Sequence, residues 1–202
     1  LEEIQNEETP FNPISPYAIA KLGAHYLVKN YRKAYNIQGS TGILFNHESE
    51  FRGGEFVTKK ITNWLAHYKK NLKGPIPLGS FDSRRDWGYA PEYVKAMQLI
   101  NEEDKSDDYV VATNTSYTVR EFLEWCCHEL DYDVEFSGKG VDEICYNKKD
   151  GKKIAYVDKK YFRPSDVNQL RGSYDKINKS LNWKPKVDAK KLAQIMTKYD
   201  IE

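Results

Sequence analysis

The stretch Ser15-Pro16-Tyr17-Ala18-Ile19-Ala20-Lys21 is the feature that most constrains how this chain folds. Serine is a favoured helix N-cap and proline suits the first helical position, so a helix should run from Pro16 to about Ala34. Tyr17 and Lys21 then lie four residues apart on one face. An ammonium near a phenol favours the phenolate, so this pair can take a proton from a hydroxyl group. The spacing alone favours a plainer interpretation, a surface tyrosine beside a solvated lysine.

The elements that follow alternate between helix and strand, which predicts an α/β protein whose later part forms a smaller α+β lobe. Apolar residues form a stripe along one face of the first helix. The stripe consists of Ala20, Ala24, Leu27 and Tyr31. Further strands are expected over 40–45, 76–78, 108–113, 133–136 and 154–157, and helices over 55–71, 90–101, 118–130, 174–181 and 188–199. Polar composition predicts a loop over 80–88 and a surface excursion over 137–153.

The amino-acid composition limits the classes of partner that this chain is expected to bind. With 202 residues and 40% hydrophobic residues, the chain can bury one good core. Its 31 basic and 30 acidic residues give a net charge of +1, which predicts neither nucleic-acid nor membrane binding. Cys126, Cys127 and Cys145 are odd in number and lack zinc-site spacing, so we expect no metal and favour a reducing, cytoplasmic location.

Polar residues follow the first expected strand directly. Asn46-His47-Glu48-Ser49 stands at its carboxyl end, where α/β sheets bind ligands. Arg52 then enters a glycine loop, and a guanidinium there can bind a phosphate with paired N–H donors. No glycine-rich phosphate turn follows a strand anywhere, so a dinucleotide would need a half of the sheet that this sequence does not contain.

Several stretches are informative because of their order and their spacing, and together they extend over nearly the whole chain. The Tyr-x-x-x-Lys spacing is weakly specific, whereas Asn-His-Glu-Ser and Arg-Asp-Trp-Gly are much narrower signals. The stretches are Pro10-Phe11-x-Pro13-x-Ser15-Pro16-Tyr17-Ala18-x-Ala20-Lys21, Gly42-Ile43-Leu44-Phe45-Asn46-His47-Glu48-Ser49, Phe56-Val57-Thr58-x-Lys60-Ile61, Leu78-Gly79 with Arg85-Asp86-Trp87-Gly88, Thr118-Val119-Arg120-Glu121-Phe122, Tyr161-Phe162-Arg163-Pro164 and Trp183-Lys184-Pro185.

Together these stretches resemble the GDP-mannose 4,6-dehydratase family of extended short-chain dehydrogenases/reductases. The resemblance implies the C-terminal portion of such an enzyme, a hydro-lyase with a Rossmann-like NAD(P)-binding fold. Residues 1–75 would complete the cofactor domain and 76–202 would mainly form the nucleotide-sugar lobe. The family also implies a homo-oligomer, either a dimer or a tetramer.

The implied reaction converts GDP-mannose to GDP-4-keto-6-deoxy-mannose with NADP as a tightly held cofactor. Tyr17 would deprotonate the C4 hydroxyl as hydride passes to NADP, water would leave across C5 and C6, and the hydride would return to C6. Lys21 would bind the nicotinamide ribose and support the Tyr17 phenolate. His47 and Arg52 match positions that contact NADP in the family.

Five further residues would hold the GDP-sugar by the same resemblance: Asn46, Lys60, Arg85, Arg163 and Asp166. Four of them, and also His47, have a plainer interpretation. Asn46 would cap a strand end, Lys60 would be solvated on its helix, and Arg85 would pair with Asp86. Likewise, His47 would be a packed neutral histidine and Arg163 a surface residue.

The chain departs from the family pattern at several points. Glu50-Phe51 precedes Arg52 where the family often has a second arginine, and Asp166 stands where the family usually has glutamate. The family's glycine-rich turn and its catalytic glutamate are absent. Two other functions therefore stay open: a truncated, non-catalytic GDP-sugar-binding protein, and a related reductase or epimerase acting on a GDP-linked keto-sugar.

Overall fold

The computed structural model describes residues 2–162 and 170–202, and its first helix is α1 (Pro16–Tyr35). Ser15 Oγ accepts a hydrogen bond from the Ala18 N–H at 3.1 Å, and the helix ends at Asn36 in a left-handed conformation. The predicted helix is therefore confirmed, including its cap.

The apolar stripe of α1 is largely exposed. Leu27 and Tyr31 are 61% and 50% exposed, and His25 is the only buried residue of the helix. The side that includes Leu22 and Val28 is partly covered instead. Helical periodicity identifies an apolar face, but the neighbouring elements decide which face is covered.

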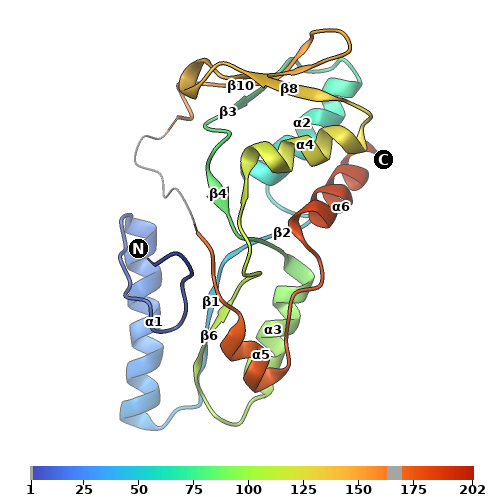
Figure 1. Ribbon diagram of the computed structural model, residues 1–202. Helices are drawn as coiled ribbons and strands as arrows, with labels where there is room; N and C mark the ends of the chain where they lie inside the picture. The colour runs from blue at the N-terminus through green and yellow to red at the C-terminus, as the bar shows by residue number, and fades with distance from the viewer. Residues whose placement is uncertain (1, 163–169) are drawn as a thin grey trace.

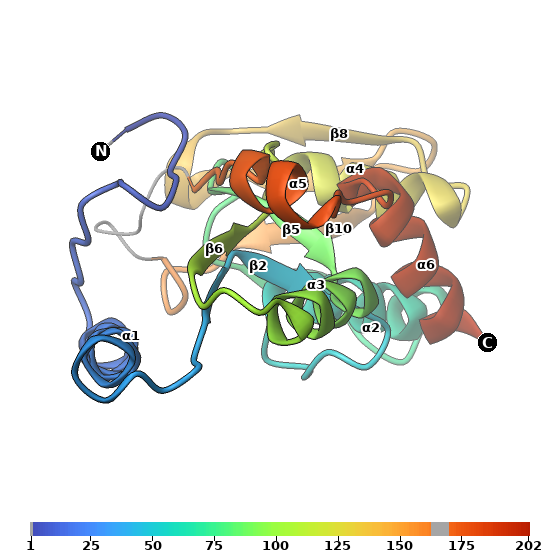
Figure 2. The same ribbon diagram turned by 90° about the horizontal axis from the view of Figure 1, so that it is seen from below.

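A parallel pair of strands lies beside α1. β1 (Thr41–Leu44) pairs with β6 (Asp108–Val111), with Thr41 opposite Asp108 and Leu44 opposite Val111. Two helices cover opposite faces of this pair, α3 (Ala90–Glu102) on the side of α1 and α5 (Asp175–Leu181) on the other (Figure 2). The buried residues between them are Tyr93, Ala96, Ile100, Tyr109, Val111, Ile177 and Trp183.

Short strands connect this layer to the rest of the molecule. β2 (Asn46–Glu48) pairs in parallel with β5 (Trp87–Tyr89), and β4 (Arg84–Arg85) pairs antiparallel with β7 (Tyr117–Thr118). The stretch predicted as a polar loop thus contains two strands. The reason is Trp87, which is 2% exposed and packs its ring 5.3 Å from that of Phe122.

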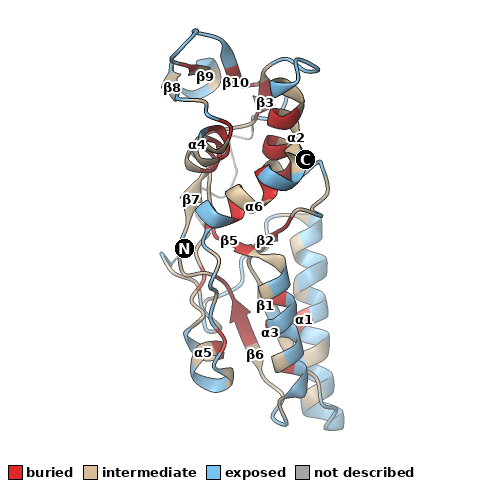
Figure 3. Cartoon of the chain, turned by 90° about the vertical axis from the view of Figure 1, so that its right-hand side faces the viewer, coloured by how far each residue is buried: buried red, intermediate tan, exposed pale blue. Residues whose placement is uncertain are grey.

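The larger core lies in the upper part of the molecule in Figure 1. Three helices pack together there: α2 (Val57–Lys69), α4 (Val119–Glu129) and α6 (Ala189–Ile201). Thr118 and Glu121 form the predicted capping box at the start of α4. In Figure 3 the buried residues concentrate on these helices, whereas α1 is mostly exposed.

A four-stranded sheet completes this part, in the order β3-β10-β9-β8. β10 (Lys153–Val157) pairs in parallel with β3 (Ile76–Leu78) and antiparallel with β9 (Ile144–Asn147), and β8 (Val134–Ser137) pairs with β9. A 3-10 turn, Gly140–Asp142, joins β8 to β9. The predicted surface excursion therefore contains a core strand, because Cys145 is fully buried.

All three cysteines are buried and none forms a disulfide. Among the helices of the described residues, none combines the length and apolar character that a membrane span requires.

Candidate functional site

Tyr17 and Lys21 line the same cavity. It has a volume of about 540 Å³ and lies between α1 and β1, with Leu22, His25 and Ile43 among its walls. The N-terminal end of α1 stands beside the carboxyl end of β1, because the two elements run in opposite directions (Figure 1). Tyr17 is 74% exposed, so its hydroxyl is accessible from outside the chain.

His47 lies on β2 and is held on two sides. Its Nδ1 is 2.8 Å from the Phe45 carbonyl oxygen, to which it donates, and its ring stacks on Tyr93 with centroids 5.0 Å apart. This hydrogen bond places the proton on Nδ1 and leaves Nε2 as the nitrogen that can contact a ligand.

Arg52 is part of a network within the chain. Its Nε lies 3.0 Å from Glu48 Oε2, and its guanidinium carbon lies 3.4 Å from the Phe56 ring centroid. Glu48 is buried and also accepts a hydrogen bond of 2.7 Å from Thr58 Oγ1. Burial raises the pKa of Glu48, against the lowering effect of these partners. Glu48 and Phe56 thus orient the Arg52 guanidinium on the loop that follows β2.

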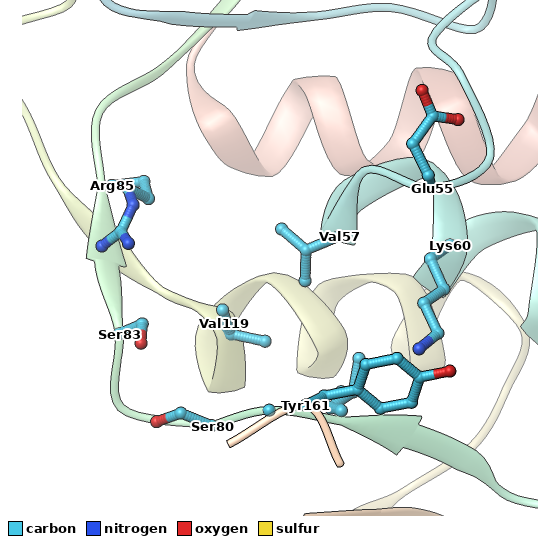
Figure 4. Close-up of a pocket in the computed structure, with 10 residues that line it drawn as sticks. Glu55, Val57, Lys60, Ser80, Ser83, Arg85, Val119 and Tyr161 are labelled. Carbon is cyan, nitrogen blue, oxygen red and sulfur yellow. The ribbon is translucent and has the colours of Figure 1, made fainter. Parts of the chain in front are cut away.

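A second cavity, of about 230 Å³, lies between α2, β4 and the turn after β3. Figure 4 shows Arg85 at one side of it and Lys60 with Tyr161 at the other, with Val57 and Val119 between them. Arg85 Nη1 donates to the Arg84 carbonyl oxygen at 2.8 Å, which helps to orient its guanidinium.

Asp86 follows Arg85 and is fully buried in the core. Its Oδ1 accepts from the N–H of Thr113 at 2.9 Å and from its hydroxyl at 2.7 Å, and its Oδ2 accepts from the Gly172 N–H at 3.1 Å. Burial raises the pKa of Asp86 to about 6. The carboxylate thus links β4 and β5 to the segments around 113 and 172.

Lys60 is partly buried rather than extended into solvent. Its Nζ donates to the Pro77 carbonyl oxygen at 2.5 Å and lies 3.9 Å from the Tyr161 ring centroid. Burial lowers the pKa of Lys60, and the nearby Asp158 carboxylate partly offsets that shift.

The predicted residues thus gather in two places. Tyr17 and Lys21 share the larger cavity, and Lys60 and Arg85 share the smaller one. Three others, Asn46, His47 and Arg52, lie on β2 and its following loop and line neither of these cavities. Arg163 and Asp166 lie outside the described residues.

Tyr161 and Ser83 also line the smaller cavity, although the sequence predicted no role for either residue. Tyr161 begins the Tyr-Phe-Arg-Pro stretch, so its motif was a signal that could have identified it. Ser83 has no comparable signal, because its place depends on the short pairing of β4 with β7.

The chain is also similar to proteins of known family. A family model described as GDP-mannose 4,6 dehydratase matches residues 1–196. The chain belongs to this family. A GDP-mannose 4,6 dehydratase of Drosophila melanogaster is 45% identical over 100% of this chain and 51% of its own length. GDP-mannose 4,6 dehydratase 1 of Arabidopsis thaliana is 46% identical over 98% of this chain and 50% of its own. The chain therefore spans about half the length of these family members.

Solved structures establish the fold. RMD from Pseudomonas aeruginosa, complexed with NADPH, superposes with a TM-score of 0.80 at 18% identity, covering 98% of this chain and 60% of that one. A dTDP-glucose 4,6-dehydratase from Bacillus anthracis, in complex with NAD, gives a TM-score of 0.76 at 19% identity, covering 97% and 55%. The predicted fold is confirmed: the chain is α/β and corresponds to part of a Rossmann-like fold of the extended short-chain dehydrogenase/reductase type.

Proposed function

We propose that this chain supplies the Tyr/Lys pair and much of the nucleotide-sugar site of a GDP-mannose 4,6-dehydratase. Such an enzyme is a hydro-lyase that forms GDP-4-keto-6-deoxy-mannose from GDP-mannose. One observation carries the proposal. In a chain that matches the family model over residues 1–196, Tyr17 and Lys21 line one cavity between α1 and β1.

The residues present suit a nicotinamide dinucleotide. The larger cavity, at about 540 Å³, falls within the range of roughly 300–1,000 Å³ usual for small-molecule sites. Lys21, His47 and Arg52 offer an ammonium, an imidazole nitrogen and guanidinium N–H groups, which suit ribose hydroxyls and phosphates. When bound, NADP would accept a hydride from C4 of the sugar and return it at C6.

Tyr17 would remove the proton from the C4 hydroxyl as a general base. Lys21, which lines the same cavity, would hold the nicotinamide ribose. At the smaller cavity, Lys60 and Arg85 would hold the GDP moiety, together with Asn46, Arg163 and Asp166.

We also propose a homo-oligomer in the cytoplasm, with residues 1–75 in the cofactor domain and 76–202 mainly in the nucleotide-sugar lobe. The exposed apolar residues of α1 support an assembly, since a face of this kind is typical of contacts between chains. The three buried thiols are compatible with a reducing compartment.

The decisive experiment joins this chain to the complementary half of the Drosophila melanogaster relative and measures products from GDP-mannose and NADP. We expect a 4-keto-6-deoxy sugar nucleotide. Tyr17→Phe should reduce turnover by at least about 10²-fold, the lower range of a lost general base, while GDP affinity changes less than about twofold. Tyr26→Phe, an exposed tyrosine on the same helix, is the matched control and should keep full turnover.

Two outcomes would redirect the proposal. A folded chimera that binds GDP-mannose without forming product would favour the non-catalytic alternative. A reduced or epimerised product from a GDP-linked keto-sugar, with no dehydration of GDP-mannose, would favour the other alternative.

A further inference from the structure

The lysines of this chain are unevenly distributed over its surface. The whole chain has a net charge of +1, yet residues 69–73 and 148–153 together hold seven lysines and a single acidic residue, Asp150. The first stretch begins at the last residue of α2, and the second joins β9 to β10. All seven lysines are exposed, and we call them the lysine surface. They are Lys69, Lys70, Lys73, Lys148, Lys149, Lys152 and Lys153.

The two stretches lie side by side, because Tyr68 connects them. Its hydroxyl, near the end of α2, donates to the Lys153 carbonyl oxygen at 3.1 Å, and its ring meets that of Tyr132 edge-on with centroids 6.2 Å apart. Both stretches lie at the top of the molecule in Figure 1, away from α1. None of the seven lysines lines either of the two cavities described above. The lysine surface is therefore separate from the proposed catalytic and nucleotide-sugar residues.

Only two of these seven charges are paired within the described residues. Lys148 Nζ lies 2.8 Å from Asp133 Oδ1, and Lys152 Nζ lies 3.6 Å from Asp150 Oδ2. The five other lysines form no ion pair in the part of the chain that the structure describes. Several ammonium groups on one surface create a positive potential, which attracts an anionic partner.

The side chains in these two stretches favour one kind of anionic partner. They include no arginine, whereas phosphate recognition favours arginine because a guanidinium can bind phosphate with two parallel N–H groups. Leu72 stands between Lys70 and Lys73 and is 68% exposed. Trp64 Nε1 donates to the Gly74 carbonyl oxygen at 2.8 Å, which holds the turn that contains Leu72 against α2. An exposed leucine among lysines suits a peptide that has both carboxylates and an apolar side chain.

We propose that the lysine surface binds an acidic peptide segment of a partner protein. Carboxylates of the peptide pair with the lysines, and an apolar side chain of the peptide packs on Leu72. The charges accelerate association and make it sensitive to salt, whereas the apolar contact resists salt. This inference does not depend on the proposed dehydratase function.

Binding of labelled peptides to the 202-residue chain tests the proposal by fluorescence anisotropy. One peptide consists of glutamate and aspartate around a central leucine, and a second has glycine in place of the leucine. An oligothymidylate of equal charge and vesicles of phosphatidylserine and phosphatidylcholine are the competing probes. We expect the leucine peptide to bind more tightly than every other probe, and its affinity to fall as sodium chloride is added.

Paired charge reversals locate the site. Lys70→Glu with Lys149→Glu should weaken binding of the leucine peptide about tenfold, because two attractions become two repulsions. Lys179→Glu with Lys190→Glu, on the exposed surfaces of α5 and α6, changes the net charge equally and should leave the affinity within about twofold. Leu72→Ser should remove the preference for the leucine peptide over the glycine peptide and keep the salt dependence.

Circular dichroism confirms that each variant is folded before its affinity is compared. The proposal is wrong if the folded chain binds neither peptide, if it binds the two peptides equally, or if the two paired reversals weaken binding to the same extent. Tighter binding of the oligothymidylate or of the phosphatidylserine vesicles would also overturn it, because the lysine surface would then suit a nucleic acid or a membrane.

Discussion

The helices α1 and α6 differ in how closely they pack against the rest of the molecule. α1 has 20 residues, of which His25 alone is buried. α6 has 13 residues, of which five are buried against α2 and α4. Both sequences are amphipathic, so the difference comes from their neighbours rather than from their own pattern.

The polar contacts of α6 and α1 differ in the same way. The Asp200 carboxylate of α6 accepts from Lys59 and, at 2.6 Å, from Thr62 Oγ1, both on α2. α1 has an ion pair between Arg32 Nη2 and Asp108 Oδ1 at 2.5 Å, which ties it to β6. The proposed catalytic pair therefore stands on the more weakly held helix, whereas the smaller cavity is built largely on the packed part of the molecule.

The largest expected effect is the loss of a core ring. Phe122 is fully buried beside Trp87, so Phe122→Ala should lower the free energy of unfolding by about 3–5 kcal/mol in urea titrations. Leu27→Ala on α1 should change it by less than about 0.5 kcal/mol, because that side chain is 61% exposed. Equal losses for the two variants would mean that the face of α1 is covered in solution.

The next effect depends on pH. Because burial raises the pKa of Asp86 to about 6, the folded state holds this proton more tightly than the unfolded state. Stability from this group is therefore complete below about pH 4 and falls as pH rises to about 6, by about 3 kcal/mol at most. Asp86→Asn should be less stable overall but lack this fall, as measured by urea unfolding from pH 4 to 7. Parallel curves for the two proteins would contradict the assignment.

Loss of the helix N-cap should affect stability differently in α4 and in α1. Thr118→Ala removes the capping box of α4 and should lower the global free energy of unfolding by about 1 kcal/mol. Ser15→Ala removes the corresponding bond of α1 and should lower amide protection only within that helix, because its fraying need not disturb the main core. Hydrogen exchange would measure this difference between the two caps. A loss of global stability in Ser15→Ala would contradict the expected difference.

The smallest expected effect concerns the ion pair that connects α1 to β6. Arg32→Gln removes the ion pair with Asp108 and should change global stability by less than about 1 kcal/mol, because α1 can open locally without disturbing the main core. Amide exchange in α1 should nevertheless become faster. Lys33→Gln, on the exposed surface next to it, is the charge-matched control and should leave exchange unchanged.

The local sequence determined the elements whose signals are short-range. The Ser15 cap, the capping box at Thr118 and the runs that became β1 and β6 followed from nearby residues, because caps and periodicity act over one or two turns. The side-by-side placement of Tyr17 and Lys21 also followed from helical spacing.

Tertiary structure alone decided which face of α1 is covered, that Cys145 belongs to a core strand, and that Lys60 lies over Tyr161. These facts depend on residues far apart in the chain. A side chain becomes buried only when two surfaces pack together, and a single stretch of sequence specifies only one of those surfaces. The contact between positions 60 and 161 exists because β10 pairs with β3 and brings the following turn onto the cavity.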